Sequence, residues 1–485
     1  MDLVMLWIGW LLVWLFGAAA LLALASMPRL RRDGETAFVV GAGFLAGQFL
    51  LTVWMRLLAL AGLRFGLGTI GVPLVVATAV TLAIAWRRHR ETMLPDVRGG
   101  FAALAGRALP VRWRVVASAL LAWLALRAAL LLIEVLRRPL FPWDAWTQWA
   151  TKARVWYAEG TLVPFVTAPQ WLALPNASVW FDAAPHYPAT VPLTQVWSAI
   201  LLGRFDDALV NLPWWLTAVA FGLALYGFLR GVGLRALVAL VGTWLVLSLP
   251  ILDTHVALAG YADLAMSAYF TLTGLALLRF LRSRSRFDLA VLLVMALACV
   301  TIKNPGKLWL AMLVPALVAG LVPKYGLRIA GAMFALAALV ALVLTRVGIT
   351  FLGYRLQLVF DMPWSGLTEA YFTFANWHLL FYGVVAVALL AGRRALAPPL
   401  VPLTLIVAAG FAFLMFGFAF TNARQWVEDQ STVNRATLHL APLIVVWMIL
   451  AFRAWADDRA KATVAASSDL QAPHDGATSA TATSR

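Results

Sequence analysis

The sequence is poor in cysteine and in charge. Only one of its 485 residues is a cysteine, Cys299, so no disulfide can form within one chain. Charged residues make up 12% of the sequence, whereas hydrophobic residues make up 63%. An ordinary soluble globular protein carries about twice that share of charge, so this class is excluded. A chain of this composition is expected to bury its apolar side chains in a lipid bilayer.

Acidic residues are also scarce, with 22 Asp and Glu against 38 Lys and Arg and a formal net charge of +16. The basic residues lie in short segments between apolar runs, as the positive-inside rule of membrane proteins requires. We therefore expect contact with membrane lipids and no nucleic-acid partner. No Lys or Arg precedes the first apolar run. A signal peptide normally begins with basic residues, so this run is predicted to be a retained span.

Long apolar runs recur along most of the chain, and a helix needs about 20 such residues to cross a bilayer. About thirteen spans are predicted, at residues 4–27, 36–61, 67–86, 115–136, 209–229, 236–252, 262–281, 288–302, 308–323, 329–350, 378–392, 399–420 and 437–452. Several runs are short, so some helices are expected to be broken or buried within the protein. The predicted fold class is all-α, a polytopic transmembrane helical bundle.

The basic segments predict the orientation and the domains. Seven of them fall on one side if the N-terminus is outside and the C-terminus is cytoplasmic. This orientation makes 137–208 a large outer loop, in which 191–202 is predicted to be an amphipathic interfacial helix or a re-entrant one. The expected parts are 1–114, with N-terminal spans and a basic cytoplasmic loop; 115–453, the transmembrane core; and 454–485, a disordered cytoplasmic tail.

The outer loop begins with a stretch in which charges alternate with large rings. If 141–157 is helical, Trp146 and Trp149 share a stripe, and Asp144 and Lys152 fall within one broad sector. A belt of aromatic residues at the headgroup level is the plainer interpretation of the rings. It does not account for a carboxylate, Asp144, among them.

Polar clusters also occur elsewhere in the predicted outer segments. The five clusters are Asp144 with Lys152 and Arg154; Asp182, His186 and Tyr187; Tyr261 and Asp263; Lys303, Asn304 and Lys307; and Arg435 with His439. Structural roles are the alternatives: a helix cap for Asp263, an ordinary loop histidine at His186, and lipid-directed cations at Lys303 and Arg435. No His, Cys and Asp spacing typical of a metal site is present, so neither a metal nor another cofactor is predicted.

Carboxylates, cations and rings on one membrane face suit sugar transfer from a lipid-phosphate donor. The acceptor hydroxyl needs a carboxylate to take its proton. The phosphate leaving group is already anionic and needs cations. Glycine residues 43 and 47 have a different expected role, the close packing of two helices.

The order of these motifs resembles that of bacterial GT-C glycosyltransferases, the superfamily of protein O-mannosyltransferases and lipid A aminoarabinose transferases. The resemblance covers about 115–310 and rests on Trp143-Asp144-Ala145-Trp146, His186-Tyr187-Pro188, Gly260-Tyr261-Ala262-Asp263 and Lys303-Asn304-Pro305-Gly306. It implies a GT-C-like core, a polyprenyl-phosphate sugar donor, inverting transfer and a site at the outer face, with Asp144 as the catalytic base. Two features depart from the family: three predicted spans precede the core, and Pro305 stands where an acidic residue is expected.

We therefore predict a glycosyltransferase of the bacterial inner membrane that moves a sugar from polyprenyl phosphate to a glycan or lipid of the cell envelope. The predicted catalytic residue is Asp144, and the predicted substrate-binding residues are Trp143, Trp146, Lys152, Asp182, His186, Tyr187, Tyr261, Asp263, Lys303, Asn304 and Arg435. The alternatives are a transporter or flippase of lipid-linked saccharide and a non-catalytic scaffold for polysaccharide assembly. Transporters tend to carry ionisable groups at the membrane midplane. Arg127 and Glu134, within one predicted span, are interpreted instead as a structural pair.

Overall fold

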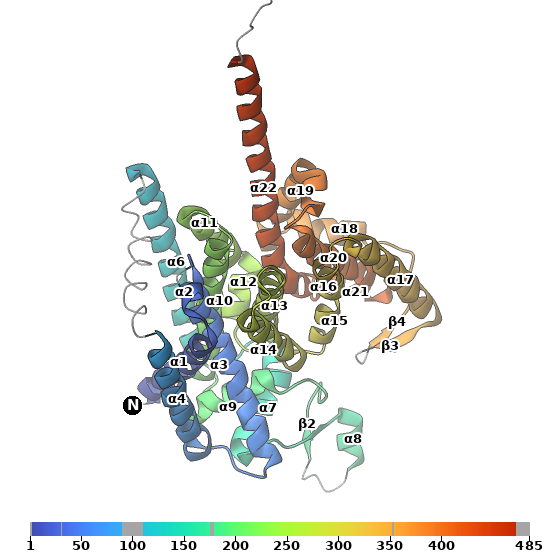
Figure 1. Cartoon of the computed structure of the whole chain (residues 1–485). Helices are drawn as coiled ribbons and strands as arrows, with labels where there is room; N and C mark the ends of the chain where they lie inside the picture. Colours follow the sequence, from blue (N-terminus) through green and yellow to red (C-terminus); the bar gives the residue numbers. More distant parts are fainter. Residues whose placement is uncertain (1, 31, 90–109, 175–178, 352–353, 472–485) are drawn as a thin grey trace, which may run out of the picture.

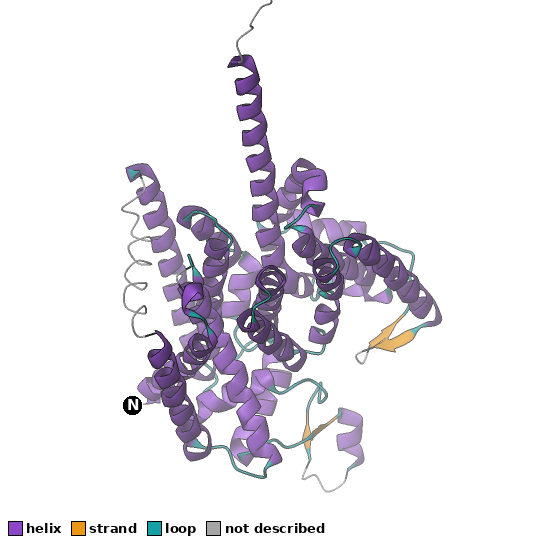
Figure 2. Ribbon diagram, viewed as in Figure 1, coloured by secondary structure: helices purple, strands orange, loops and turns teal. Residues whose placement is uncertain are grey.

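The computed structural model describes residues 2–30, 32–89, 110–174, 179–351 and 354–471, and these residues are nearly all helical (Figures 1 and 2). Two short strand pairs are the exceptions. Strands β1 (Phe165–Val166) and β2 (Trp180–Phe181) are parallel, and β3 (Ile349–Phe351) and β4 (Tyr354–Leu356) are antiparallel. The predicted all-α class is confirmed.

Nine helices of the described part are long and apolar enough to cross a membrane. They are α1 (Asp2–Leu24), α3 (Glu35–Leu60), η1 (Leu67–Gly71) continued by α4 (Val72–His89), α6 (Val111–Arg137), η3 (Leu209–Asn211) continued by α10 (Leu212–Gly231), α13 (Asp263–Ser283), α17 (Gly326–Val347), α20 (Val401–Phe420) and α22 (Val433–Gln471). The chain is thus a multi-pass membrane protein. Helices α3, α10 and α13 are mostly buried, whereas α6 and α17 lie at opposite edges of the bundle (Figure 1).

The predicted number of thirteen spans is not confirmed, because four of the predicted segments form short, bent or broken helices. These four are α11 (Ala236–Leu247) with α12 (Pro250–Ala257), α14 (Arg286–Ile302), α15 (Gly306–Ala311) with α16 (Val314–Leu321), and α19 (Leu380–Ala391). The chain bends by 62° between α11 and α12, where Pro250 begins the second helix. Proline lacks an N–H and favours the first turn of a helix, so it marks such breaks.

Short helices and turns fill the connecting segments. They are α2 (Met27–Leu30), η2 (Ala145–Trp149), α7 (Ala150–Glu159), α8 (Ala168–Ala173), α9 (Thr190–Leu202), α18 (Trp364–Thr368), η4 (Glu369–Thr373), η5 (Ala375–Trp377), η6 (Gly392–Leu396), η7 (Asn422–Arg424) and α21 (Gln425–Glu428). Helices α7, α8 and α9 of the predicted outer loop lie together at one end of the bundle. The final helix, α22, projects from the opposite end (Figure 1).

Helix α9 differs from its predicted surface position. All its residues except Ile200 are buried, so it is not an amphipathic helix lying at an interface. Helices α1, α3, α7 and α14 pack around it. An apolar helix of 13 residues is too short to span a bilayer, and surrounding it with protein satisfies its apolar surface instead.

Close packing of the N-terminal helices depends on glycine. A Cβ atom added to Gly47 of α3 would lie 2.2 Å from the carbonyl oxygen of Val13 on α1, and one added to Gly43 would lie 2.6 Å from Ala18 Cα. On another face of α3, Gly41 approaches the backbone of α10 in the same way. The predicted packing role of Gly43 and Gly47 is confirmed. Helices α1 and α3, which precede residue 115, therefore pack closely on each other, and α3 packs directly on α10 of the predicted core.

A network of four charges joins α2 and α3 to α13 and α14. Arg29 Nε lies 2.7 Å from Glu35 Oε1, and Arg279 contacts both Glu35 (2.6 Å) and Asp288 (2.9 Å). Arg29 also pairs with Asp288, which is fully buried. Two cations and two carboxylates neutralise one another, which makes their burial tolerable.

The predicted disordered tail is partly wrong, because α22 continues through 454–471 as far as Gln471. Six alanines between 454 and 466 favour helix strongly, and the apolar part of α22 already supplies its nucleus. Residues 472–485 of the predicted tail lie outside the described residues. The same holds for 90–109, most of the predicted basic loop.

Replacing Gly47 with valine is expected to lower the thermal unfolding temperature of the purified protein. The new side chain would collide with backbone atoms of α1, and overpacking of this kind costs about 1–3 kcal/mol. Gly331 of α17 is the matched control, since open space surrounds the position of its missing Cβ. Equal unfolding temperatures for Gly47→Val and Gly331→Val would contradict the packing role of Gly47.

Candidate functional site

The candidate site is built around the carboxylate of Asp263, the first residue of α13, which is completely buried. Lys303 Nζ, just after α14, lies 2.7 Å from Asp263 Oδ1. Arg435, in the first turn of α22, donates to Asp263 Oδ2 from Nη2 (2.8 Å) and Nε (3.1 Å). The three side chains turn towards one another rather than to lipid or a helix end. The interpretations of Asp263 as a cap and of the two cations as lipid-directed are therefore wrong.

Arg435 also connects this cluster to the predicted outer loop. Its Nη2 lies 2.6 Å from Asp144 Oδ2, so Asp144 and Asp263 share one guanidinium nitrogen. The side chain of Asp144 is 27% exposed, whereas that of Asp263 has no exposed surface. Asp144 is thus the carboxylate of this pair that an incoming molecule can reach.

His439 completes the environment of Asp263, one helical turn after Arg435. Trp309 Nε1 lies 2.9 Å from His439 Nδ1, and His439 Nε2 lies 3.0 Å from Asp263 Oδ1. An indole N–H can only donate, so Nδ1 must accept and carries no proton. His439 is therefore a neutral imidazole that donates from Nε2 to Asp263, because a second proton would remove the hydrogen bond from Trp309.

Aromatic rings surround the charged groups on the outer side. The guanidinium carbon of Arg435 lies 4.3 Å from the centroid of the Tyr261 ring, a cation–π contact. Trp143 and Trp146 flank Asp144 and pack edge to face at 5.2 Å, and both rings are largely exposed. Such free aromatic faces next to an accessible carboxylate suit the apolar face of a sugar ring.

Lys152 does not join Asp144, contrary to the prediction. Its Nζ lies 3.2 Å from Asp182 Oδ1 and donates to the Ala184 carbonyl at 2.6 Å. Lys152 and Asp182 are both almost completely buried, and burial lowers the pKa of Lys152 and raises that of Asp182. Arg154 pairs with Asp207 instead. The three charged residues of the predicted first cluster thus have three different partners: Arg435 for Asp144, Asp182 for Lys152 and Asp207 for Arg154.

The predicted helical register of 141–157 is wrong for a local reason. Residues 145–149 form a single π-helical turn before the α-helix α7 begins. This wider turn shifts the residues before it relative to a regular helix. Trp149 and Ala153 face the core, as the stripe predicts, but Trp146 is 47% exposed.

The other predicted binding residues divide between the two clusters. Tyr187 packs edge-on against Trp149 at 5.2 Å and stacks near His186, so both belong with the Lys152–Asp182 pair. Asn304 follows Lys303 in the sequence and is buried. The structure therefore brings Asp144, Tyr261, Asp263, Lys303 and Arg435 together.

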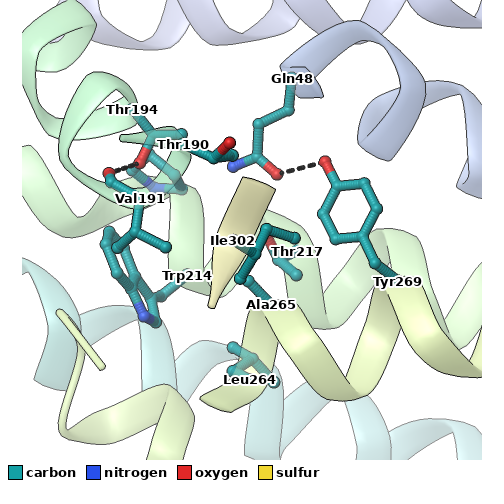
Figure 3. Close-up of a pocket in the computed structure, with 11 residues that line it drawn as sticks. Gln48, Thr190, Val191, Thr194, Trp214, Thr217, Leu264, Ala265, Tyr269 and Ile302 are labelled. Atoms are coloured by element: carbon teal, nitrogen blue, oxygen red, sulfur yellow. Dashed lines mark hydrogen bonds between the residues drawn. The ribbon is translucent and has the colours of Figure 1, made fainter. Parts of the chain in front are cut away.

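A small cavity with a mixed polar and apolar lining lies next to the Asp263 cluster, between α3, α9, α10 and α13 (Figure 3). Its volume, about 20 Å³, is enough for a single water molecule. Gln48, which accepts a hydrogen bond from Tyr269, and the hydroxyl-bearing Thr190, Thr194 and Thr217 line it. The space is too small for a sugar, and the exposed part of the cluster is at Asp144.

No group of three or more His, Cys, Asp or Glu side chains within the described ranges is arranged to hold a metal ion. The chain matches no protein-family model, no curated protein and no solved structure. The chemistry of the site is therefore argued from its own geometry.

Replacing Lys152 with methionine is expected to destabilise the protein by about 3–5 kcal/mol, because Asp182 would be left buried without its cation. Adding Asp182→Asn to this variant should recover part of the loss. Arg154→Met is the matched control on the same helix: its ion pair with Asp207 is exposed, so removal should cost less than about 1 kcal/mol. Thermal unfolding in detergent measures all three, and equal losses for the two single variants would contradict a structural ion pair at Lys152.

Proposed function

We propose that this protein is an inverting glycosyltransferase that moves a sugar from a polyprenyl-phosphate donor to a hydroxyl group of a cell-envelope glycan or lipid. The observation that carries the proposal is the Arg435 guanidinium shared between a buried carboxylate, Asp263, and an accessible one, Asp144. It places a proton acceptor next to two cations, Arg435 and Lys303, at the end of the bundle that holds the large loop.

Each residue has a role in the proposed reaction. Asp144 takes the proton of the acceptor hydroxyl, whose oxygen forms a bond to the anomeric carbon of the sugar. The bond between that carbon and the phosphate oxygen breaks, and its electron pair leaves with the polyprenyl phosphate. Lys303 and Arg435 stabilise the released phosphate. Asp263 and His439 hold the two cations in position.

The charges of the site favour this sequence of events. With His439 neutral, the two cations balance the two carboxylates, so the resting site has no net charge. A donor phosphate that reaches Arg435 competes with Asp144 for the same nitrogen. Asp144 is then released from its ion pair, which leaves its carboxylate oxygen free to take the proton of the acceptor hydroxyl. Its neutralisation by the acceptor proton offsets the added phosphate charge.

Asp144→Asn is expected to abolish transfer while tightening the binding of polyprenyl phosphate. General-base assistance is worth about 10²–10⁴-fold in rate, and the amide no longer competes as an anion for Arg435. Sugar incorporation in a deletion strain and native mass spectrometry of the purified protein with a short-chain polyprenyl phosphate measure the two effects.

Asp207→Asn, which changes an exposed carboxylate of the same loop, is the control and should affect neither quantity. Full transfer by Asp144→Asn would remove Asp144 as the base. Weaker phosphate binding by Asp144→Asn would contradict the competition for Arg435.

The proposed site requires Asp144 to face the outside of the inner membrane. Reporter fusions after Arg114 and after Arg459 should both show a cytoplasmic location, and a fusion near residue 175 should show an outer one. The asymmetry of the basic loops is the reason for this expectation. A cytoplasmic signal near residue 175 would place the carboxylate on the wrong side for an outer-face reaction.

A transporter or flippase of lipid-linked saccharide is the second candidate, and one ion pair favours it. Arg127 of α6 pairs with Asp253 of α12, not with Glu134 as predicted; Glu134 pairs with Arg138. The predicted Arg127–Glu134 pair is wrong because the bend between α11 and α12 brings Asp253 against α6. Charges between membrane helices often mark transport paths. Translocation in proteoliposomes that survives Asp144→Asn would favour this candidate.

A further inference from the structure

Arg56 of α3 is a partly buried cation with an unusual set of partners. Its Nη2 donates to Thr190 Oγ1 at 2.8 Å, and its Nη1 makes a long contact of 3.4 Å with Thr52 Oγ1. It forms no ion pair with any carboxylate in the part of the chain that the structure describes. Arg56 thus carries a charge that no carboxylate of the described residues neutralises.

This lack of a carboxylate distinguishes Arg56 from the other cations inside the bundle. Arg29, Lys152, Arg279, Lys303 and Arg435 are each paired with Asp or Glu. Arg56 lies four residues before the end of α3, about 6 Å along the helix, and so within reach of the headgroup region. A cation removed from water at this level needs an anion from elsewhere.

Arg56 has hydrogen-bond donors left for such an anion. A guanidinium has five N–H donors, and only two of these are used by threonine hydroxyls. Thr190 in turn donates to Thr301 Oγ1 at 3.0 Å, which fixes the hydroxyl of α9 against α14. The remaining donors of Arg56 are planar and diverging, which matches the oxygens of a phosphate group.

An exposed apolar stripe on α14 leads to this place. Leu293 and Leu297 are both more than half exposed and lie two turns and one turn, respectively, before Thr301 on the same helix face. A hydrocarbon chain lying along this stripe would bring its headgroup to Thr301 and Arg56.

We propose that the free N–H groups of Arg56, whose guanidinium is held by Thr190 and through it by Thr301, bind the phosphate group of an anionic membrane lipid whose acyl chain lies along Leu293 and Leu297. The site is separate from the cations at Asp263, because Lys303 and Arg435 are already paired there. Lys303 is only two residues beyond Thr301, at most about 7 Å along the chain, so the bound lipid borders the candidate active site. Binding at Arg56 does not depend on the transfer reaction.

The test measures the anionic lipid that stays bound to the full-length protein. The protein is reconstituted in nanodiscs of phosphatidylcholine with a minor fraction of phosphatidylglycerol, re-extracted, and analysed by native mass spectrometry. Arg56→Gln should lower the retained phosphatidylglycerol about tenfold, the value of one charged hydrogen-bonded contact. Thr301→Val should lower it less, and Arg56→Lys should keep part of it.

Arg64→Gln is the matched control, because it removes the same charge from an exposed position just after α3 and should leave retention unchanged. Equal losses for Arg56→Gln and Arg64→Gln, or no loss for Arg56→Gln, would overturn the site. Inorganic phosphate at millimolar concentration should displace no more lipid than chloride of equal ionic strength does. Displacement by inorganic phosphate alone would overturn the assignment to a lipid. Size-exclusion profiles that match the unmodified protein show that each variant is folded.

Discussion

The burial of one carboxylate, Asp263, is the constraint on which the arrangement of the site depends. A buried charge of this kind must be compensated, and the compensation comes from Lys303 after α14 and from Arg435 and His439 on α22. These contacts join the start of α13 to two other helices. Since Arg435 also binds Asp144, the same requirement positions the first turn of the segment that follows α6. The site is therefore organised by a single electrostatic demand.

Because Arg435 is shared between two carboxylates, the site can respond to an added anion in a way that two separate ion pairs could not. Asp144 and Asp263 depend on the same guanidinium, so a third anion cannot approach Arg435 without changing the state of Asp144. Asp263 is less affected, because Lys303 and His439 still hold it. The buried Asp263 therefore stays in place, whereas the accessible Asp144 is the carboxylate that loses its partner.

Much of this arrangement could be predicted from the sequence, and the failures have local causes. Apolar runs predicted all the long helices, and the polar motifs at their ends predicted the meeting of Asp144, Asp263, Lys303 and Arg435. The predicted number of spans is not confirmed because prolines such as Pro250 break apolar runs without changing the composition of those runs. The partner of Lys152 depends on how the segment before α9 folds back, which no periodicity records.

His439 was named only as a neighbour of Arg435. The four-residue spacing of Arg435 and His439 on one helix face was the available signal for a shared target. The hydrogen bond from Trp309, which fixes the proton on His439, joins residues 130 positions apart and could not be predicted from spacing.

Helix α13 is held at both of its ends. Asp263 is fixed at the first residue, and Arg279, 16 residues and about 24 Å further on, is fixed in the network of Arg29, Glu35 and Asp288. These contacts at its two ends restrain both tilting and sliding of α13. The segment that carries Asp144 is therefore anchored to a fixed helix end, by Arg435 and by the close approach of Ala145 to Gly260.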